Sequence, residues 1–299
     1  MITFIFNLLI KVIALTIISF DKVFRTIFKK NNFLPKIHDI LETKQYYTNI
    51  INNKKIKFFC PSYKTIARVE TLHYKEIETL NWINNFKENE NKEIIFWDIG
   101  SNIGIFSIYA AEMFNNIEVI SFEPSTSNTR VLSRNISINN LSDKIKILPF
   151  ALSDKPNIIS ELNETIFSEG SSKSSYHHKI DAYGKKLSDS EINNKYSIFG
   201  TTTDDLIKSK LLKFPNYIKI DVDGIEHLIL KGSSNLLKNS SLKQVLVEMS
   251  PSFTEQFKEI ENIFDENGFN KILFTNSNLI RNKDYKLKKT ETLNAIFSR

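Results

Sequence analysis

From residue 93 to the C-terminus, short runs of consecutive apolar residues alternate with longer amphipathic segments. Continuous apolar runs are typical of strands that are buried on both faces, and apolar residues three or four positions apart are typical of helices. The expected strands are residues 93–97, 118–122, 144–150, 217–222, 242–248, 271–274 and 294–298, and the expected helices are residues 103–114, 127–139, 225–237 and 254–267. The alternation predicts a Rossmann-like α/β fold whose mainly parallel sheet carries helices on both faces.

Residues 154–203 interrupt this alternation, because they are polar, rich in serine and without a clear period. Long segments of this kind in compact domains are usually functional, so we expect an irregular loop that covers the site. Ahead of the alternation, residues 37–62 are expected to form irregular structure and short strands. Residues 75–86 carry apolar side chains at mostly helical spacing, which predicts a helix.

The segment from Asp98 to Gly104, with sequence DIGSNIG, follows the first expected strand of the alternation. Gly100 and Gly104 allow a sharp turn and a close approach of the backbone to a ligand. A dinucleotide site typically has the pattern G-x-G-x-x-G at this place, whereas this chain has G-x-N-x-G. A carboxylate at the strand end would repel a pyrophosphate and would suit a cationic amino-acid ligand. The alternative is a tight strand-to-helix turn without a ligand.

Glu123 and Pro124 follow the next expected strand, nineteen residues after Gly104. A carboxylate at this place in a Rossmann-like domain can accept hydrogen bonds from both hydroxyls of a ribose. Pro124 fixes the chain directly after it. The alternative is a solvated acid at the end of a strand.

Four ionisable residues, Asp221, Asp223, Glu226 and His227, follow the strand expected at 217–222. In open α/β sheets, ligands bind beyond the carboxyl ends of the strands. Carboxylates placed so close together raise some of each other's pKa values, which suits a general base or a metal ligand. For Glu226 and His227, helix-terminal charge and packing is an equal alternative. No Cys/His cluster has the spacing of a metal site, so no residue is assigned as a metal ligand.

Taken together, these motifs resemble the FkbM family of S-adenosylmethionine-dependent methyltransferases. The resemblance rests on FFCP at 58–61, KEIET at 75–79, Asp98–Gly104, FEP at 122–124 with Asn128, ALSD at 151–154, TTDDL at 202–206 and KIDVDGIE at 219–226. Departures from the family pattern are Ser101, Thr203 and Asp223, where the family commonly has Ala, Leu and Glu. The resemblance implies a class I methyltransferase fold.

The resemblance also implies an enzyme that binds S-adenosylmethionine and methylates hydroxyls, often on sugars or polyketides. The residues that would hold the cofactor are Asp98, Gly100, Ser101, Asn102, Gly104, Glu123, Pro124, Ala151 and Asp221. A hydroxyl nucleophile must lose its proton as it attacks. We expect Asp221 or His227 to take that proton, with Asp223 and Glu226 orienting the acceptor or a divalent ion. The alternatives are an NAD(P)-dependent dehydrogenase and a non-catalytic membrane-associated module.

The N-terminal segment 1–20 is strongly apolar, with Lys11 near its middle. Its charge stands inside and after the apolar run, which is wrong for a cleaved signal peptide. Thr3, Asn7 and Lys11, continued by Lys22, Arg25 and Lys29, form one polar stripe of an α-helix. An amphipathic helix in the membrane interface is therefore favoured over a membrane span and over a helix packed on the protein. If the helix spans, the cations after it place the next domain in the cytoplasm.

The positive charge of the chain is concentrated at this end. Residues 1–60 hold ten Lys and Arg against three Asp and Glu, so in a chain of net charge +6 the remainder is close to neutral. A basic surface beside apolar residues suits an anionic membrane face better than nucleic acid. We expect a membrane-associated helix at 1–30, an extension at 31–92 and a methyltransferase domain at 93–299. The enzyme would lie at the cytoplasmic face of the membrane, with a small-molecule or glycan acceptor; its oligomeric state stays open.

Overall fold

The structure is a computed structural model that describes residues 2–30, 33–87, 93–275 and 292–299. Contacts divide the chain into two compact units, Met1–Tyr46 and Tyr47–Arg299. Residues 47–87, expected as part of an extension, belong to the same compact unit as the α/β sheet.

The first unit consists of α1 (Ile2–Phe28) and α2 (Phe33–Glu42). Asp21 of α1 is buried, and its carboxylate binds the Nε of Arg25 at 2.6 Å and the main-chain N–H of Leu34 at 3.3 Å. These bonds fix the start of α2 against α1. Most large apolar side chains of α1 are exposed, among them those of Phe4 and Leu15.

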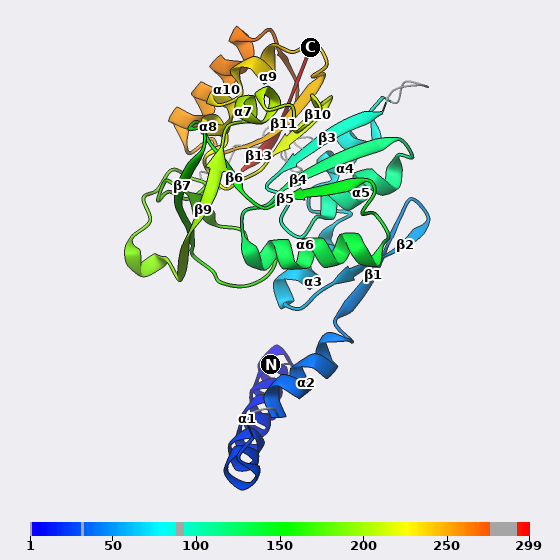
Figure 1. The fold of residues 1–299 in the computed structure, drawn as a ribbon, viewed down its shortest axis with the longest axis vertical. Helices are drawn as coiled ribbons and strands as arrows, with labels where there is room; N and C mark the ends of the chain where they lie inside the picture. Colours follow the sequence, from blue (N-terminus) through cyan, green and yellow to red (C-terminus); the bar gives the residue numbers. More distant parts are fainter. Residues whose placement is uncertain (1, 31–32, 88–92, 276–291) are drawn as a thin grey trace. The chain divides into compact units, whose positions relative to one another are not determined.

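The second unit is built on a seven-stranded sheet with the order β12-β13-β11-β10-β3-β4-β5 (Figure 1). Its strands are β3 (Ile94–Ile99), β4 (Ile117–Phe122), β5 (Ile145–Leu148), β10 (Tyr217–Ile220), β11 (Gln244–Met249), β12 (Asn270–Thr275) and β13 (Leu293–Ser298). β13 pairs antiparallel with both β11 and β12, and the pairs from β11 to β5 are parallel. Every residue of β3 and β4 is buried, which explains why these strands read as continuous apolar runs. The predicted fold class is confirmed.

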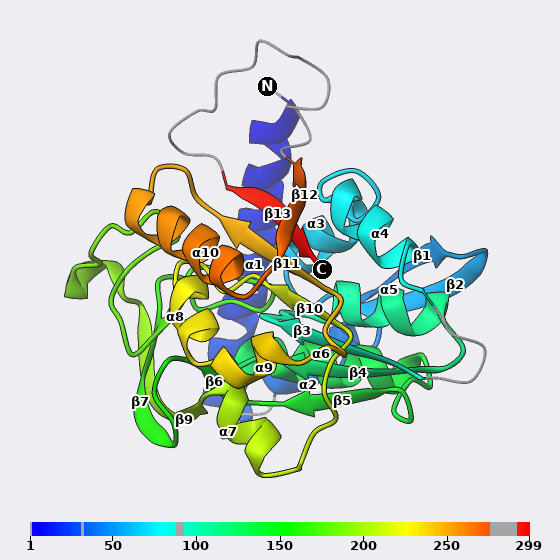
Figure 2. The ribbon, with the colours of Figure 1, turned by 90° about the horizontal axis from the view of Figure 1, so that it is seen from above.

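Helices cover both faces of this sheet (Figure 2). One face carries α4 (Ile77–Asn84), α5 (Ile105–Met113) and α6 (Thr126–Ile138), and the other carries α7 (Thr203–Lys208), α8 (Glu226–Lys231), α9 (Ser234–Lys238) and α10 (Thr254–Glu266). The single helix expected at 225–237 is broken into α8 and α9. The break lies at Gly232, where a Cβ would overlap the carbonyl oxygen of Ser153.

The segment before the sheet forms a hairpin and a further helix. The hairpin consists of β1 (Tyr46–Ile51) and β2 (Lys54–Phe59), and α3 (Tyr63–Thr71) follows it. The side chain of Asn135 on α6 accepts the main-chain N–H of Phe59 at 2.7 Å, so β2 is tied to α6. The helix α3 was not expected; a capping box between Ser62 and Thr65 starts it.

The expectation that residues 154–203 form an irregular loop is wrong. They contribute most of a second sheet with the order β6-β9-β7-β8, in which the strands are β6 (Ala151–Leu152), β7 (Ile158–Glu164), β8 (Ser174–Tyr176) and β9 (Asn194–Thr201). β7 and β9 are antiparallel, with Ile158 opposite Gly200 at one end of the pairing and Glu164 opposite Asn194 at the other. Residues of β9 alternate between more and less exposed positions up to Phe199, and β7 is partly exposed over its first four residues. Such half-exposed strands carry many polar residues, and this hid them in the sequence.

Candidate active site

The turn between β3 and α5 packs directly against the end of β10. Gly100 has φ +85°, and a Cβ there would overlap the main-chain carbonyl oxygen of Asp221. Gly104, also at φ +85°, is the N-cap of α5 and lies against Leu132. At Gly100 the backbone has a positive φ and another atom already occupies the position of a Cβ, and only glycine satisfies both conditions without strain. The turn therefore brings main-chain atoms to the carboxyl ends of β3 and β10.

Glu123 connects this turn to the end of β4. Its carboxylate accepts the main-chain N–H of Asn102 at 2.7 Å and that of Ser125 at 2.9 Å. Glu123 is 4% exposed, and burial raises its pKa to about 7 although both hydrogen bonds oppose this rise. Each carboxylate oxygen can accept a second hydrogen bond, so Glu123 can still bind a ligand hydroxyl.

A cavity, here called the central cavity, lies beyond the carboxyl ends of β3, β4, β10 and β11. One part of its lining is apolar: Phe122, Pro124, Phe150, Ala151, Leu152, Leu162, Tyr176, Val222 and Ile225. The other part is polar and includes Arg68, Lys75, Glu76, Gly100, Asn102, Glu123, Asn128, Asp221, Asp223 and Glu248. Five carboxyl side chains against two cations make this lining acidic, which suits a cationic ligand with one apolar end.

Asp221 is held by a buried cation. The Nζ of Lys219, a residue only 1% exposed, lies 2.6 Å from Oδ2 of Asp221 and over the ring of Phe106. Burial alone would raise the pKa of Asp221, but the Lys219 ammonium outweighs it and holds that pKa below its usual value. Burial would likewise lower the pKa of Lys219, yet Asp221 and Glu76 raise it. Asp221 is therefore an ionised and weakly basic carboxylate.

Glu248, at the end of β11, completes this cluster. Burial, together with Asp221 and Asp223, raises the pKa of Glu248 well above its usual value. Both carboxyl groups line the central cavity, and a protonated Glu248 favours the ionised form of Asp221. Glu248 also accepts the hydroxyl of Thr292 at 2.8 Å. We infer that Glu248 is protonated.

A second cavity of about 590 Å³ adjoins the central one. Its lining mixes polar and apolar side chains and comes mainly from the segment between β7 and β9; the polar ones include Thr165, Lys173, Asp181, Tyr183, Ser190, Glu191 and Asn193, and the apolar ones include Ile166, Ile180 and Leu187. Five residues line both cavities: Lys75, Ser172, Ser174, Asp223 and Glu248. The two cavities therefore meet at these side chains. The expectation that the 154–203 segment contributes to the site agrees with this lining, although the segment is not an irregular loop.

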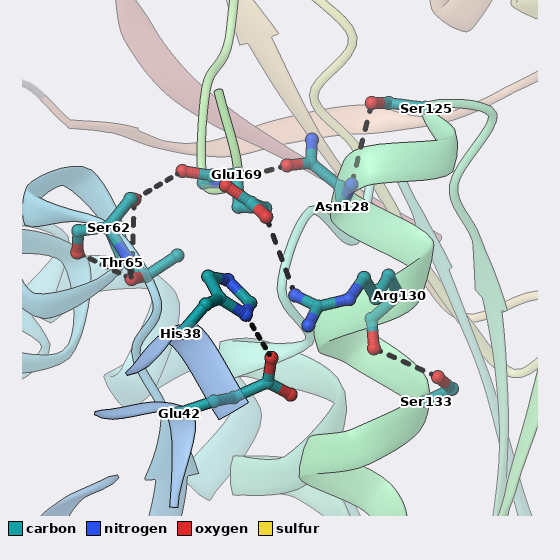
Figure 3. A network of polar contacts seen from close by, with 10 residues as sticks. His38, Glu42, Ser62, Thr65, Ser125, Asn128, Arg130, Ser133 and Glu169 are labelled. Carbon is teal, nitrogen blue, oxygen red and sulfur yellow. Dashed lines mark hydrogen bonds and ion pairs between the residues drawn. The ribbon is translucent and has the colours of Figure 1, made fainter. Parts of the chain in front are cut away.

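A short segment, here called the strap (residues 169–172), contributes Ser171 and Ser172 to the lining of the central cavity, and Figure 3 shows the polar contacts that hold it at Glu169. Asn128 binds it twice, accepting the N–H of Gly170 at 2.9 Å and donating to the carbonyl of Ser171 at 3.0 Å. Ser62 donates to the carbonyl of Glu169, whose carboxylate lies 3.4 Å from Arg130. These bonds tie the strap to α6 and to the start of α3.

Four of the residues singled out in the sequence do not line the cavities: Gly104, which supports the glycine turn, and Asp98, Glu226 and His227. Asp98 is fully buried behind the glycine turn, where it accepts the hydroxyl of Ser107 at 2.5 Å. The carboxylate of Glu226 folds back onto the N–H groups of Val222 and Gly224.

His227 points toward α10, packing on Phe253 with its Nε2 4.0 Å from Glu259. None of Asp98, Glu226 and His227 therefore faces the cavities, and for Glu226 and His227 this arrangement matches the alternative of helix-terminal charge and packing.

The other candidates lie together. Gly100, Asn102, Glu123, Pro124, Ala151, Asp221 and Asp223 line the central cavity, and Gly100, Ser101, Asn102 and Asp221 line a smaller pocket beside it. Gly104 supports the turn from behind, as described above.

The sequence reasoning missed the roles of Arg68, Lys75, Glu76, Lys219 and Glu248. Lys219 could have been found as a lone cation inside an apolar strand; Arg68, Lys75 and Glu76 carry no such signal. Among the residues that the structure describes, no three His, Cys, Asp or Glu side chains are grouped so as to hold a metal ion.

Comparison with known proteins identifies the family. The model of the "Methyltransferase FkbM domain" matches residues 98–271, more than half of the chain. The chain is 28% identical over 191 residues to "Methyltransferase sdnD" of Sordaria araneosa, covering 57% of this chain and 72% of that protein. It is 28% identical over 162 residues to "Hexuronic acid methyltransferase AglP" of Haloferax volcanii, covering 54% of this chain and 58% of that protein.

Among solved structures, the methyltransferase FkbM of Methylobacillus flagellatus KT matches with a TM-score of 0.43 and 11% identity, covering 79% of this chain and 62% of that one. The family match over residues 98–271 decides the assignment. This chain belongs to the FkbM family of S-adenosylmethionine-dependent methyltransferases.

Proposed function

We propose that this enzyme methylates a hydroxyl group of a glycan or of a related cell-surface precursor. The observation that carries the proposal is the junction, at Asp223 and Glu248, of the central cavity with a second cavity that polar side chains help to line. The second cavity offers hydroxyl, amide and carboxylate groups, which are the partners that sugar hydroxyls use. A relative named for methylating hexuronic acid supports a sugar as acceptor.

The chemistry of the central cavity's lining suits S-adenosylmethionine. Glu123 would bind the ribose hydroxyls, and the apolar side chains around Phe150 and Ala151 would flank the adenine. The turn at Gly100 and Asn102 would face the methionine part, whose positive charge suits the carboxyl groups nearby. When bound, the cofactor supplies a methyl group activated by the positive charge on its sulfur. The residues of this chain contribute position and proton removal, which govern displacements of this kind.

The dehydrogenase alternative fits this cavity poorly. A dinucleotide would place its anionic pyrophosphate at the turn between β3 and α5. Here the same space borders Glu76, Glu123 and Asp221. Repulsion between these carboxylates and a pyrophosphate would weaken binding.

The first unit supports a location at the cytoplasmic face of a membrane. Among the described helices, the stretch Phe4–Phe28 is long and apolar enough to cross a bilayer by length and composition. The cations Lys11, Lys22 and Lys29 are exposed along it. Apolar side chains beside cations favour contact with a membrane that carries anionic lipids. An acceptor attached to a lipid would then be concentrated near the enzyme.

Transfer of a labelled methyl group tests the proposed function. Purified protein is incubated with methyl-labelled S-adenosylmethionine and a cell-envelope extract of the source organism, and the products are fractionated. We expect label in a glycan or glycolipid fraction, in a linkage that resists mild base because it is an ether. Label in protein or nucleic acid would contradict the proposal. Binding of S-adenosylhomocysteine without transfer to any fraction would instead favour a non-catalytic module.

A further inference from the structure

Asp223 occupies the point where the two cavities meet. It lines both of them and is half-buried. Its backbone has φ +62°, and the next residue, Gly224, has φ +124°. A Cβ on Gly224 would come within 2.5 Å of the carbonyl oxygen of Asp181. The turn is thus pressed against the segment between β7 and β9, in a conformation that a non-glycine residue keeps only when its surroundings enforce it.

Within the described residues, one oxygen of the Asp223 carboxylate accepts a hydrogen bond from the protein, and the other does not. Its Oδ2 accepts the main-chain N–H of Lys173 at 2.7 Å. Its Oδ1 makes no hydrogen bond to any residue in the described part of the chain and is not among its buried, unpartnered atoms. One oxygen therefore holds the side chain in place, and the other is available to a ligand in the cavities.

The neighbouring ionisable groups are poorly suited to take a proton. Asp221 is bound to the Lys219 ammonium at 2.6 Å. Burial and the charges of Asp221 and Asp223 raise the pKa of Glu248 well above its usual value, which favours its protonated form. Glu226 is folded onto main-chain N–H groups, and His227 lies against α10. Asp223 is the member of this group with a free oxygen at the cavity junction.

We propose that Asp223 is the general base that deprotonates the acceptor hydroxyl, an inference that rests on the proposed O-methylation. The acceptor O–H bond breaks and its proton passes to Oδ1 of Asp223. The acceptor oxygen forms its bond to the methyl carbon while the carbon–sulfur bond breaks, and that electron pair stays on sulfur. The products are a methyl ether, neutral S-adenosylhomocysteine and protonated Asp223, which returns its proton to water in the second cavity.

The surroundings of Asp223 set the expected pH dependence. The charged and titratable groups that face it are Asp221, Glu248, Lys173, Arg68 and Tyr183. Burial, followed by the Asp221 charge, raises the pKa of Asp223 to about 6. A base must be ionised to accept a proton, so the rate of transfer should rise with pH through about 6. A general base whose pKa lies near the working pH is the efficient choice.

The variant Asp223→Asn tests this inference, because Asn tolerates a left-handed backbone and can still accept the Lys173 N–H. We expect single-turnover transfer of labelled methyl to the envelope extract to fall about 10²- to 10⁴-fold. Calorimetric affinity for S-adenosylhomocysteine should stay unchanged. The rise of rate with pH near 6 should vanish in Asp223→Asn and return in Asp223→Glu with partial activity. Asp143→Asn, at an exposed position in the α6–β5 loop, serves as the control.

Each outcome is decisive. If wild-type protein transfers label but Asp223→Asn stays within about threefold of it, Asp223 is not the base and the proposed function stands. The same holds if the variant keeps the pH profile of the wild type. If wild-type protein labels no glycan fraction, the proposed function is wrong and this inference falls with it.

Discussion

The main-chain N–H of Asn102 donates a 2.7 Å hydrogen bond to Oε2 of Glu123. This bond joins the turn after β3 to the end of β4, and the N–H of Ser125 binds the other carboxylate oxygen. The acid that would bind the ribose is therefore oriented by the turn that would face the methionine part. Because the hydrogen bond between Asn102 and Glu123 links the ribose side of the site to the methionine side, a change at Glu123 should affect binding of the whole cofactor.

Replacing Glu123→Ala should raise the Kd for S-adenosylhomocysteine about 10- to 100-fold in calorimetry. The change removes hydrogen bonds to a charged group, each contributing roughly 1.5–3 kcal/mol, and leaves two main-chain N–H groups without their partner. Glu118→Ala is the control, since Glu118 lies near the opposite end of β4 and pairs with Lys146 and Lys213. Equal affinities of wild type and Glu123→Ala would contradict a ribose role for Glu123.

The variant Gly100→Ala should lose more stability than Gly268→Ala. Both glycines have positive φ, +85° and +71°, so both substitutions cost roughly 1–2 kcal/mol of backbone strain. At Gly268 nothing lies within 4 Å of the added Cβ, whereas at Gly100 the Cβ would overlap the carbonyl of Asp221. Thermal unfolding should show a Tm loss for Gly100→Ala at least twice that for Gly268→Ala. Similar losses would mean that the turn does not pack on β10 as described.

The variant Glu226→Gln should remove part of the pH dependence of stability. Burial raises the pKa of Glu226 from 4.5 to about 7 despite its hydrogen bonds to main-chain N–H groups. The folded state therefore prefers the protonated form, by up to roughly 3 kcal/mol. This contribution is present below pH 4.5 and is lost as the pH rises through 7. Gln at 226 stays neutral, and its amide can donate to the unpartnered Oε1 of Gln256 after a flip of that side chain.

Urea unfolding at pH 5 and pH 8 measures this difference. Relative to wild type, Glu226→Gln should gain stability on going from pH 5 to pH 8. The variant Glu118→Gln should give a curve parallel to that of wild type over this range, because Lys146 and Lys213 outweigh burial and lower the pKa of Glu118 from 4.5, so that its pH-dependent contribution is lost only below pH 4.5. A Glu226→Gln curve parallel to that of wild type would show that Glu226 is ionised throughout this range.

The variants Lys22→Gln and Lys29→Gln should each weaken binding to anionic vesicles. A cation near such a surface contributes about 1 kcal/mol, which corresponds to about a fivefold change in the partition coefficient. Flotation with phosphatidylglycerol-containing vesicles measures the loss, and neutral vesicles should show no difference.

Extraction of membranes at alkaline pH separates the two membrane alternatives: release of the protein indicates an interfacial helix, and retention indicates a membrane span. Absence of binding to either vesicle would refute the membrane proposal.

Much of the α/β sheet could be predicted from the sequence, because strands buried on both faces leave an unbroken apolar run. β3, β4, β10 and β11 lie within two residues of their expected starts. The second sheet could not be predicted in this way. Its strands β7 and β9 are partly exposed and interleave Ser, Asn and Glu with apolar residues, so their composition resembles that of a loop.

For the site, the sequence identified the residues at strand ends but not their partners. Glu123, Asp221 and Asp223 were found because the carboxyl ends of parallel strands share one edge. Arg68 and Glu76 come from helical segments whose position on that edge depends on tertiary packing. His227 was misplaced because the direction of a side chain on the first turn of a short helix depends on what packs against it, here Phe253 of the segment before α10.

Isothermal titration calorimetry of the purified protein with S-adenosylhomocysteine and, separately, with NADP⁺ tests the central claim most directly. The acidic, partly apolar cavity that the Gly100 turn lines predicts binding of the nucleoside thioether in the micromolar range and no measurable heat with the dinucleotide. Heat with NADP⁺ and none with S-adenosylhomocysteine or S-adenosylmethionine would contradict the account.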